Sequence, residues 1–355
     1  MRSAALVCIL VALSTTASAA TDEHKRFAAF LDEDWEWQMR EFPTWATLVG
    51  DSRYDDKLPD YSLAAIERRK AHRRDVIKQL GKIDRARLTR EEQLDYDLYL
   101  RDARLDVEGE RFPEELLAID KMGGVHTMLA DLAPAIPRRN ALDFEHFLAR
   151  IDAYPKLVDE NLALLRKGLE RGVTPPRVTL EHLGESIGNQ ISDDPTKSPV
   201  YVLAFAQLPS SVSAADAARL QAAARKAIVE HVNVPLRAFK KFIVDEYVPH
   251  ARTTLGMSAL PDGAAWYAYR ARVSTTTEMS PEKIHELGLA EVARIGAAAE
   301  QTMRASGWKG SMPDFVRFLR SDPRFYFTDK DALLTAYRDI AKRIDPELPR
   351  LFGRL

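Results

Sequence analysis

The sequence predicts an all-α protein, a multi-helix array with at most a few short strands. Only 16 glycines and 19 prolines stand among its 355 residues, so long stretches run without a helix breaker. Apolar residues recur at helical spacing along most of the chain, and residues with capping chemistry flank these stretches. The composition, 46% apolar and 29% charged, is that of a globular protein with a buried core.

The predicted helices follow one another from residue 62 onward, and most begin at a residue that can cap a helix. In chain order they run from Ser62 to Gly81, from Thr89 to Leu105, from Asn140 to Gly172 with a kink or restart at Pro155, from Ser213 to Ile243 with an interruption at Pro235, from Ser280 to Gly307, and from Thr328 to Ile344. Thr89 with Glu92 has the spacing of a capping box. Val178–Leu180 and Val200–Leu203 are short strand candidates.

The first 19 residues have the pattern of a secretory signal peptide. One basic residue, Arg2, precedes an apolar run of about ten residues, which is too short to span a bilayer. Ala17-Ser18-Ala19 then provides a small-x-small cleavage site. We expect cleavage after Ala19 and export to the periplasm or the outside, with no membrane segment in the mature chain; an uncleaved N-terminal anchor is the alternative.

The mature chain, residues 20–355, is expected to form one helical domain. Its proline-rich region 172–209 is either a hinge or a loop that crosses the surface of the helical body. The only cysteine, Cys8, belongs to the predicted signal peptide, so no intramolecular disulfide is possible. Lipidation of Cys8 is disfavoured because too few residues precede it.

Charge and motifs exclude several functions. Lys and Arg number 51 against 53 Asp and Glu, so nucleic acid is not an expected partner. The basic run after Ser62 is expected to be a solvated helix face. No phosphate-binding glycine loop and no G-x-S-x-G motif occur. Trp35, Trp37 and Trp45 are expected to pack in the core.

The histidines do not form a zinc motif. His285 begins H-E-x-x-H, but Leu289 stands where the second histidine is needed. His182 begins H-x-x-E-H, and Ser186 stands in the place of its last histidine. The residues therefore predict neither a catalytic nor a metal-binding side chain in this chain, and no cofactor.

Several sequence blocks resemble the bacterial domain-of-unknown-function 885 family. They are Phe42–Gly50, Gln93–Asp97, Leu260–Gly263, Trp266–Tyr267, Thr275–Thr277, Pro281–Leu289, Asp322–Tyr326 and Leu351–Gly353. The resemblance covers essentially the whole mature chain.

Members of that family are similar to exported, helical, gluzincin-like zinc metallopeptidases, whose H-E-x-x-H helix lies beyond the Leu351–Gly353 block. The resemblance therefore implies that this chain is the N-terminal portion of a metallopeptidase-like fold, truncated at its C-terminus. Zinc is expected only in a full-length member, and so is a peptide substrate. From their block positions, Gly263, Tyr267, Thr275, Thr276 and Thr277 are expected to contact peptide.

Three functional hypotheses follow. In the first, the chain is the N-terminal helical part of an exported zinc metallopeptidase, and is inactive alone because it lacks the zinc motif. In the second, it is a stand-alone exported helical binding or scaffold module. In the third, it is an enzyme that combines Glu and His from separated helices. The first hypothesis predicts an unpaired apolar face around Leu333, Leu334, Tyr337 and Ile340; the oligomeric state is left open.

Overall fold

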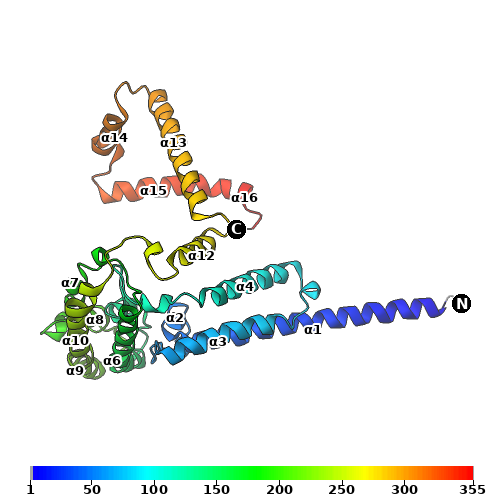
Figure 1. Ribbon diagram of the computed structural model, residues 1–355, viewed down its shortest axis with the longest axis horizontal. Helices are drawn as coiled ribbons and strands as arrows, with labels where there is room; N and C mark the ends of the chain where they lie inside the picture. The colour runs from blue at the N-terminus through cyan, green and yellow to red at the C-terminus, as the bar shows by residue number, and fades with distance from the viewer. Residues whose placement is uncertain (1–2, 355) are drawn as a thin grey trace. The chain divides into compact units, whose positions relative to one another are not determined.

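The protein is helical, as the sequence predicts. A computed structural model describes the backbone of residues 3–354 and the side chains of residues 22–354, and every regular element in these ranges is a helix (Figure 1). Contacts divide the chain into two compact units, Met1–Thr277 and Glu278–Leu355. The predicted signal peptide lies outside the residues whose side chains are described, and the region 172–209 lies inside the first unit.

The first unit contains twelve α-helices among its described residues. They are α1 (Ser3–Glu41), α2 (Pro43–Leu48), α3 (Leu63–Leu80), α4 (Arg90–Gly109), α5 (Met128–Leu132), α6 (Ala141–Glu170), α7 (Leu183–Gly188), α8 (Pro199–Ala204), α9 (Ala214–Ala227), α10 (Val234–Phe242), α11 (Val248–His250) and α12 (Gly263–Thr275). Its core has three parts: a large one around α6, a second between α1, α3 and α4, and a third where Trp266 of α12 stacks on Phe112.

Capping chemistry places most helix starts where the sequence predicts them. The Ser62 side chain accepts a hydrogen bond from the backbone N–H of Ala65, and Thr89 forms the predicted capping box with Glu92. Asn140 caps α6 in the same way. At the last predicted helix the cap is Asp329 and not Thr328, because the Asp329 carboxylate accepts from the Ala332 N–H.

Both strand candidates are wrong. Val178 lies in a 3₁₀ turn, Arg177–Thr179, and Val200 lies in α8. Pro199 suits the first turn of a helix, where its missing N–H costs nothing. A strand also needs a neighbour to pair with, and apart from an isolated bridge between Asp120 and Gly123 the described residues form no β-pairing.

Two prolines act differently from the prediction. Pro155 lies inside α6, which continues through it without a restart. Pro235 does not interrupt its helix either; a π-helical segment, Ile228–Asn233, precedes it and the chain continues as α10. A second π-helical segment, Ile243–Tyr247, precedes Pro249. Proline cannot donate the backbone hydrogen bond of a regular helix, and its ring crowds the preceding turn. The wider turn of a π-helical segment accommodates it.

The second unit contains α13 (Pro281–Ala305), α14 (Met312–Ser321), α15 (Lys330–Ile344) and α16 (Leu348–Leu351). Met303 is the one buried residue among its described side chains. Many of its large apolar side chains are exposed: Leu289, Val292 and Ile295 on α13, Phe325, Tyr326 and Phe327 before α15, and Leu333, Leu334, Tyr337, Ile340 and Ile344 on α15. The apolar face predicted for the last helices is therefore present.

Candidate functional site

The first unit contains a cavity of about 730 Å³ between α2, α3, the 117–127 segment, α5 and α6, which we call the α2–α6 cavity. Its volume is in the usual range of small-ligand sites, about 300–1,000 Å³. Apolar side chains make up much of its lining: Leu48, Tyr61, Ile66, Ala118, Met122, Val125, Met128, Leu132 and Leu164. The polar part consists of Thr44, Arg69, Glu114, Glu115, Asp120, Thr127, Asp131 and Asn161.

Arg150 fixes the α2 wall of this cavity. Its side chain is fully buried on α6, and its guanidinium donates hydrogen bonds to Thr47 Oγ1 (2.7 Å) and to three backbone oxygens, those of Pro43 (3.1 Å), Tyr54 (3.1 Å) and Lys57 (2.8 Å). Burial lowers the pKa of Arg150 to about 10, against the opposing effect of Asp55 and Asp56, so the group remains charged at neutral pH. One buried cation thus holds the whole segment from α2 to residue 57.

The 117–127 segment forms the opposite wall through a tight turn. The Asp120 carboxylate accepts hydrogen bonds from the N–H groups of Met122 (2.7 Å) and Gly123 (3.2 Å). A side chain at Gly124 would press on Ile119, because its Cβ would lie 3.0 Å from Ile119 Cγ1. The buried Tyr154 hydroxyl donates to the Val125 carbonyl (2.8 Å) and ties the turn to α6.

Asn161 lines the cavity and has unused hydrogen-bonding capacity. It is 6% exposed, and its side-chain nitrogen donates to the Leu157 carbonyl at 2.8 Å. Because a carbonyl can only accept, the amide nitrogen must face Leu157. The Oδ1 atom then has no hydrogen-bond partner among the described residues, and it keeps some solvent-accessible surface.

The charged groups around the cavity are mostly acidic. Arg69 is its only cation, and it is engaged by Glu41 (2.9 Å) and lies over the ring of Phe42. Glu114 and Glu115 each pair with a cation outside the lining. Asp131 is exposed and forms no ion pair within the described part of the chain. The cavity therefore favours positive charge in whatever occupies it.

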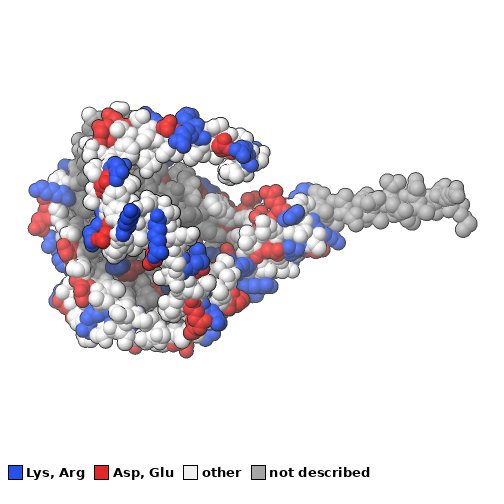
Figure 2. Space-filling view, turned by 90° about the horizontal axis from the view of Figure 1, so that it is seen from above, with Lys and Arg blue, Asp and Glu red and all other residues white. Residues whose placement is uncertain are grey.

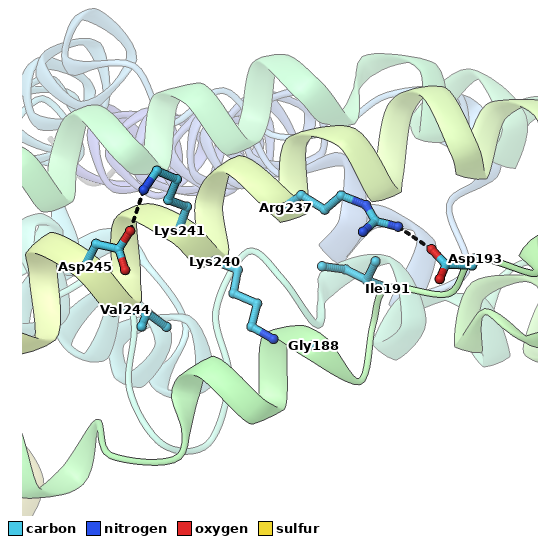
Figure 3. Close-up of a pocket in the computed structure, with 8 residues that line it drawn as sticks. All are labelled: Gly188, Ile191, Asp193, Arg237, Lys240, Lys241, Val244 and Asp245. Carbon is cyan, nitrogen blue, oxygen red and sulfur yellow. Dashed lines mark hydrogen bonds and ion pairs between the residues drawn. The ribbon is translucent and has the colours of Figure 1, made fainter.

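A second, shallower pocket of about 530 Å³ lies on α10 between the two π-helical segments (Figure 3). Its acids are already paired: Asp193 accepts from Arg237 and Asp245 from Lys241, each at 2.6 Å. The Lys240 ammonium extends over Gly188, at which a Cβ would approach it to 2.8 Å. Exposed ion pairs dominate this pocket. Basic and acidic residues are likewise interspersed on the face shown in Figure 2.

A buried carboxylate joins α1 to the α3 and α4 helices. Asp34 accepts hydrogen bonds from His72 Nε2 (2.5 Å), Gln38 (2.5 Å) and the Tyr99 hydroxyl. Burial raises the pKa of Asp34, but the hydrogen bonds from Tyr99, His72 and Gln38 outweigh it, so the pKa lies below its usual value. The His72 ring stacks on Trp37 with centroids 3.5 Å apart. These contacts hold helices together.

The residues predicted to contact peptide lie on α12 and at its end, and none of them lines the α2–α6 cavity. Gly263 is buried, and a Cβ there would lie 2.1 Å from the Met257 carbonyl oxygen, so close packing requires glycine. Tyr267 is half exposed. Thr276 ends the helix with a φ of 57°, and the hydroxyls of Thr275 and Thr277 are 3.0 Å apart. Peptide contact by these five residues stays a prediction.

Two further expectations concern the tryptophans and the histidine pairs. Trp35 and Trp45 are about half exposed, so the prediction that they pack in the core is wrong; α1 and α2 direct them outward. His182 and Glu185 form an exposed pair 3.9 Å apart. Within the described residues no three His, Cys, Asp or Glu side chains form a group that could hold a metal ion.

Fold and cavity together define an all-helical protein with a ligand-sized cavity in its first unit. The chain belongs to the family described as "Bacterial protein of unknown function (DUF885)", whose model matches residues 43–355. It is similar in fold to the crystal structure titled "putative lipoprotein from Colwellia psychrerythraea", with a TM-score of 0.81 at 17% identity. The match covers 94% of this chain and 60% of that one. A comparison with curated proteins gives no match.

No helix within the described residues is both long enough and apolar enough to cross a bilayer.

Proposed function

We propose that this chain is the N-terminal helical portion of an exported peptide-hydrolysing protein, and that the hydrolytic residues lie outside this sequence. The observation that carries the proposal is the apolar surface of the second unit. Leu334, Tyr337 and Ile340 lie at helical spacing on α15, and their exposed fractions are 47%, 65% and 51%. Exposed apolar surfaces of this kind are typical of sites where another polypeptide packs, and this supports the proposal.

The fold comparison supports the same interpretation. The chain spans 60% of the length of the similar solved structure. The solved structure therefore contains further polypeptide that this sequence does not match. Export is supported by the signal-peptide pattern of residues 1–19 and by the description of that neighbour as a lipoprotein.

Zinc does not fit the described residues. The resemblance to zinc metallopeptidases implies a metal, but no group of three suitable side chains occurs among these residues. We therefore assign no zinc-ligating residue and no reaction step to this chain. Its part in the whole protein would be to bind and position peptide.

The test compares the purified mature chain, residues 20–355, with two variants on the same helix. We expect it to bind the dye bis-ANS and to self-associate, and to hydrolyse no peptide. Leu334→Glu with Tyr337→Glu should lower dye binding, whereas Thr335→Glu, which adds charge beside the apolar face, should not. Stoichiometric, tightly bound zinc together with peptide hydrolysis would contradict the proposal.

A stand-alone exported binding module is the second candidate. The observation that favours it is that the α2–α6 cavity is built entirely from residues of the first unit. A monomeric chain that binds no dye and unfolds cooperatively would support this candidate over the first.

A further inference from the structure

We propose that the α2–α6 cavity binds a protonated amine with an apolar body, and that in this protein the ligand is the amino-terminal end of a short peptide. The peptide nature of the ligand rests on the proposed function. The amine and the apolar body rest on the cavity alone.

The apolar lining selects the body of the ligand. Leu48 and Met128 form part of the walls, and Leu132 and Leu164 are buried residues of the lining. A volume of about 730 Å³ is enough for two or three residues of a peptide. An aliphatic or aromatic side chain placed there leaves water, and the burial of its apolar surface favours binding.

Asn161 supplies the acceptor for a donor group. Its Oδ1 has no hydrogen-bond partner among the described residues and keeps solvent-accessible surface, so a ligand N–H or N⁺–H that reaches it gains a hydrogen bond that the chain itself does not supply. A carboxylate or carbonyl oxygen of the ligand in the same position could not hydrogen-bond to Oδ1, because both atoms are acceptors. The hydrogen-bonding pattern of this atom therefore discriminates against anionic ligand ends.

The charges of the lining agree with this assignment. Three of the four acidic residues of the lining already have partners: Glu114 and Glu115 pair with cations outside the lining, and Asp120 accepts from backbone N–H groups. The one cation of the lining, Arg69, is engaged by Glu41. Asp131 has no competing cation among the described residues, so its carboxylate is free to attract an ammonium group. Asp131 and Asn161 thus favour the same ligand chemistry for independent reasons.

Four probes separate the parts of the inference. Calorimetric titration of the mature chain would use Leu-Leu-amide, its N-acetyl derivative, N-acetyl-Leu-Leu with a free carboxylate, and phenethylamine. We expect Leu-Leu-amide to bind at least tenfold more tightly than its acetylated form, and the carboxylate probe to bind weakest.

Two variants and a control locate the binding. Asp131→Asn should weaken Leu-Leu-amide binding about fivefold at low salt, the scale of one exposed charge pair in water, and leave the acetylated probe unaffected. Asn161→Leu should weaken it by at least as much. Asp95→Asn makes the same charge change at an exposed, unpaired residue of α4 outside the cavity and should have no effect.

Each result has one meaning. Equal affinity for the amine and its acetylated form overturns the amine assignment, and so does an Asp131→Asn variant that binds like the parent chain. Binding of phenethylamine without binding of either dipeptide amide overturns the peptide assignment and leaves the amine assignment standing. None of these results depends on zinc, dye binding or hydrolysis, so the proposed function can fail or succeed separately.

Discussion

Replacing Arg150 by methionine should loosen the α2 wall of the cavity. The substitution removes hydrogen bonds to the Thr47 hydroxyl and to the backbone oxygens of Pro43, Tyr54 and Lys57, all from a side chain with no exposed surface. Methionine has a similar length and can fill most of the space, so the change isolates the polar contacts from the packing.

The magnitude follows from the number of acceptors left without a donor. A hydrogen bond to a charged group contributes about 1.5–3 kcal/mol, and a buried acceptor without a partner costs about 1–3 kcal/mol. Removing a buried charge recovers part of its desolvation cost, and the Nη1 atom of Arg150 has no hydrogen-bond partner even in the native structure. We therefore expect a net loss of about 3–5 kcal/mol in the free energy of unfolding.

Urea unfolding followed by far-ultraviolet circular dichroism would measure this loss, and tryptophan fluorescence would report on Trp45, which lies on α2. Arg166→Met is the matched control, because Arg166 is an exposed arginine of the same helix whose described contact is with the Phe242 ring. The free energy of unfolding of the control should fall by less than about 1 kcal/mol. If Arg150→Met were as stable as the control, the desolvation of the guanidinium would cancel its hydrogen bonds, and Arg150 would not hold α2.

Two further predictions concern stability. Asp34→Asn should lower the free energy of unfolding by about 1.5–3 kcal/mol at pH 7. Because the folded-state pKa of Asp34 is lowered, the parent chain loses this advantage as the pH falls through that pKa. The unfolding curves of the two proteins should therefore converge below about pH 3.8. Gly168→Ala should cost about 1–3 kcal/mol, because its Cβ would lie 2.7 Å from the Val173 carbonyl oxygen. Gly296→Ala, on α13 with open space around it, should instead be neutral or stabilising by up to about 1 kcal/mol. Thermal unfolding of both alanine variants checks the pair, and a tolerated Gly168→Ala would show that α6 and residue 173 can separate at little cost.

Local chemistry made much of the helical structure predictable. A cap depends on a side chain and a backbone N–H two or three residues away, so Ser62, Thr89 and Asn140 could be placed from the sequence alone. The strand candidates failed because a short apolar run such as Val200–Leu203 has no helical or strand period of its own. Pro199 and the lack of a pairing partner decided its conformation.

The cavity was not predictable in the same way. Its residues extend from Thr44 to Leu164, and no motif connects them. One signal was present: Asn161 interrupts an apolar helix face between Val158 and Leu165, and a buried asparagine needs partners. The residues expected from the family resemblance to contact peptide, by contrast, all lie on α12 or directly after it, because their sequence blocks are adjacent.

The two proposals concern different parts of the chain, and this separation makes them informative together. The α2–α6 cavity needs only residues of the first unit, whereas the exposed apolar face belongs to α15 in the second. A substitution such as Leu334→Glu should therefore change dye binding without changing the affinity for Leu-Leu-amide, and Asp131→Asn should do the reverse. If either variant altered both properties, ligand binding and the apolar face would be energetically coupled, and by linkage any polypeptide that covers α15 would also change how the cavity binds its amine.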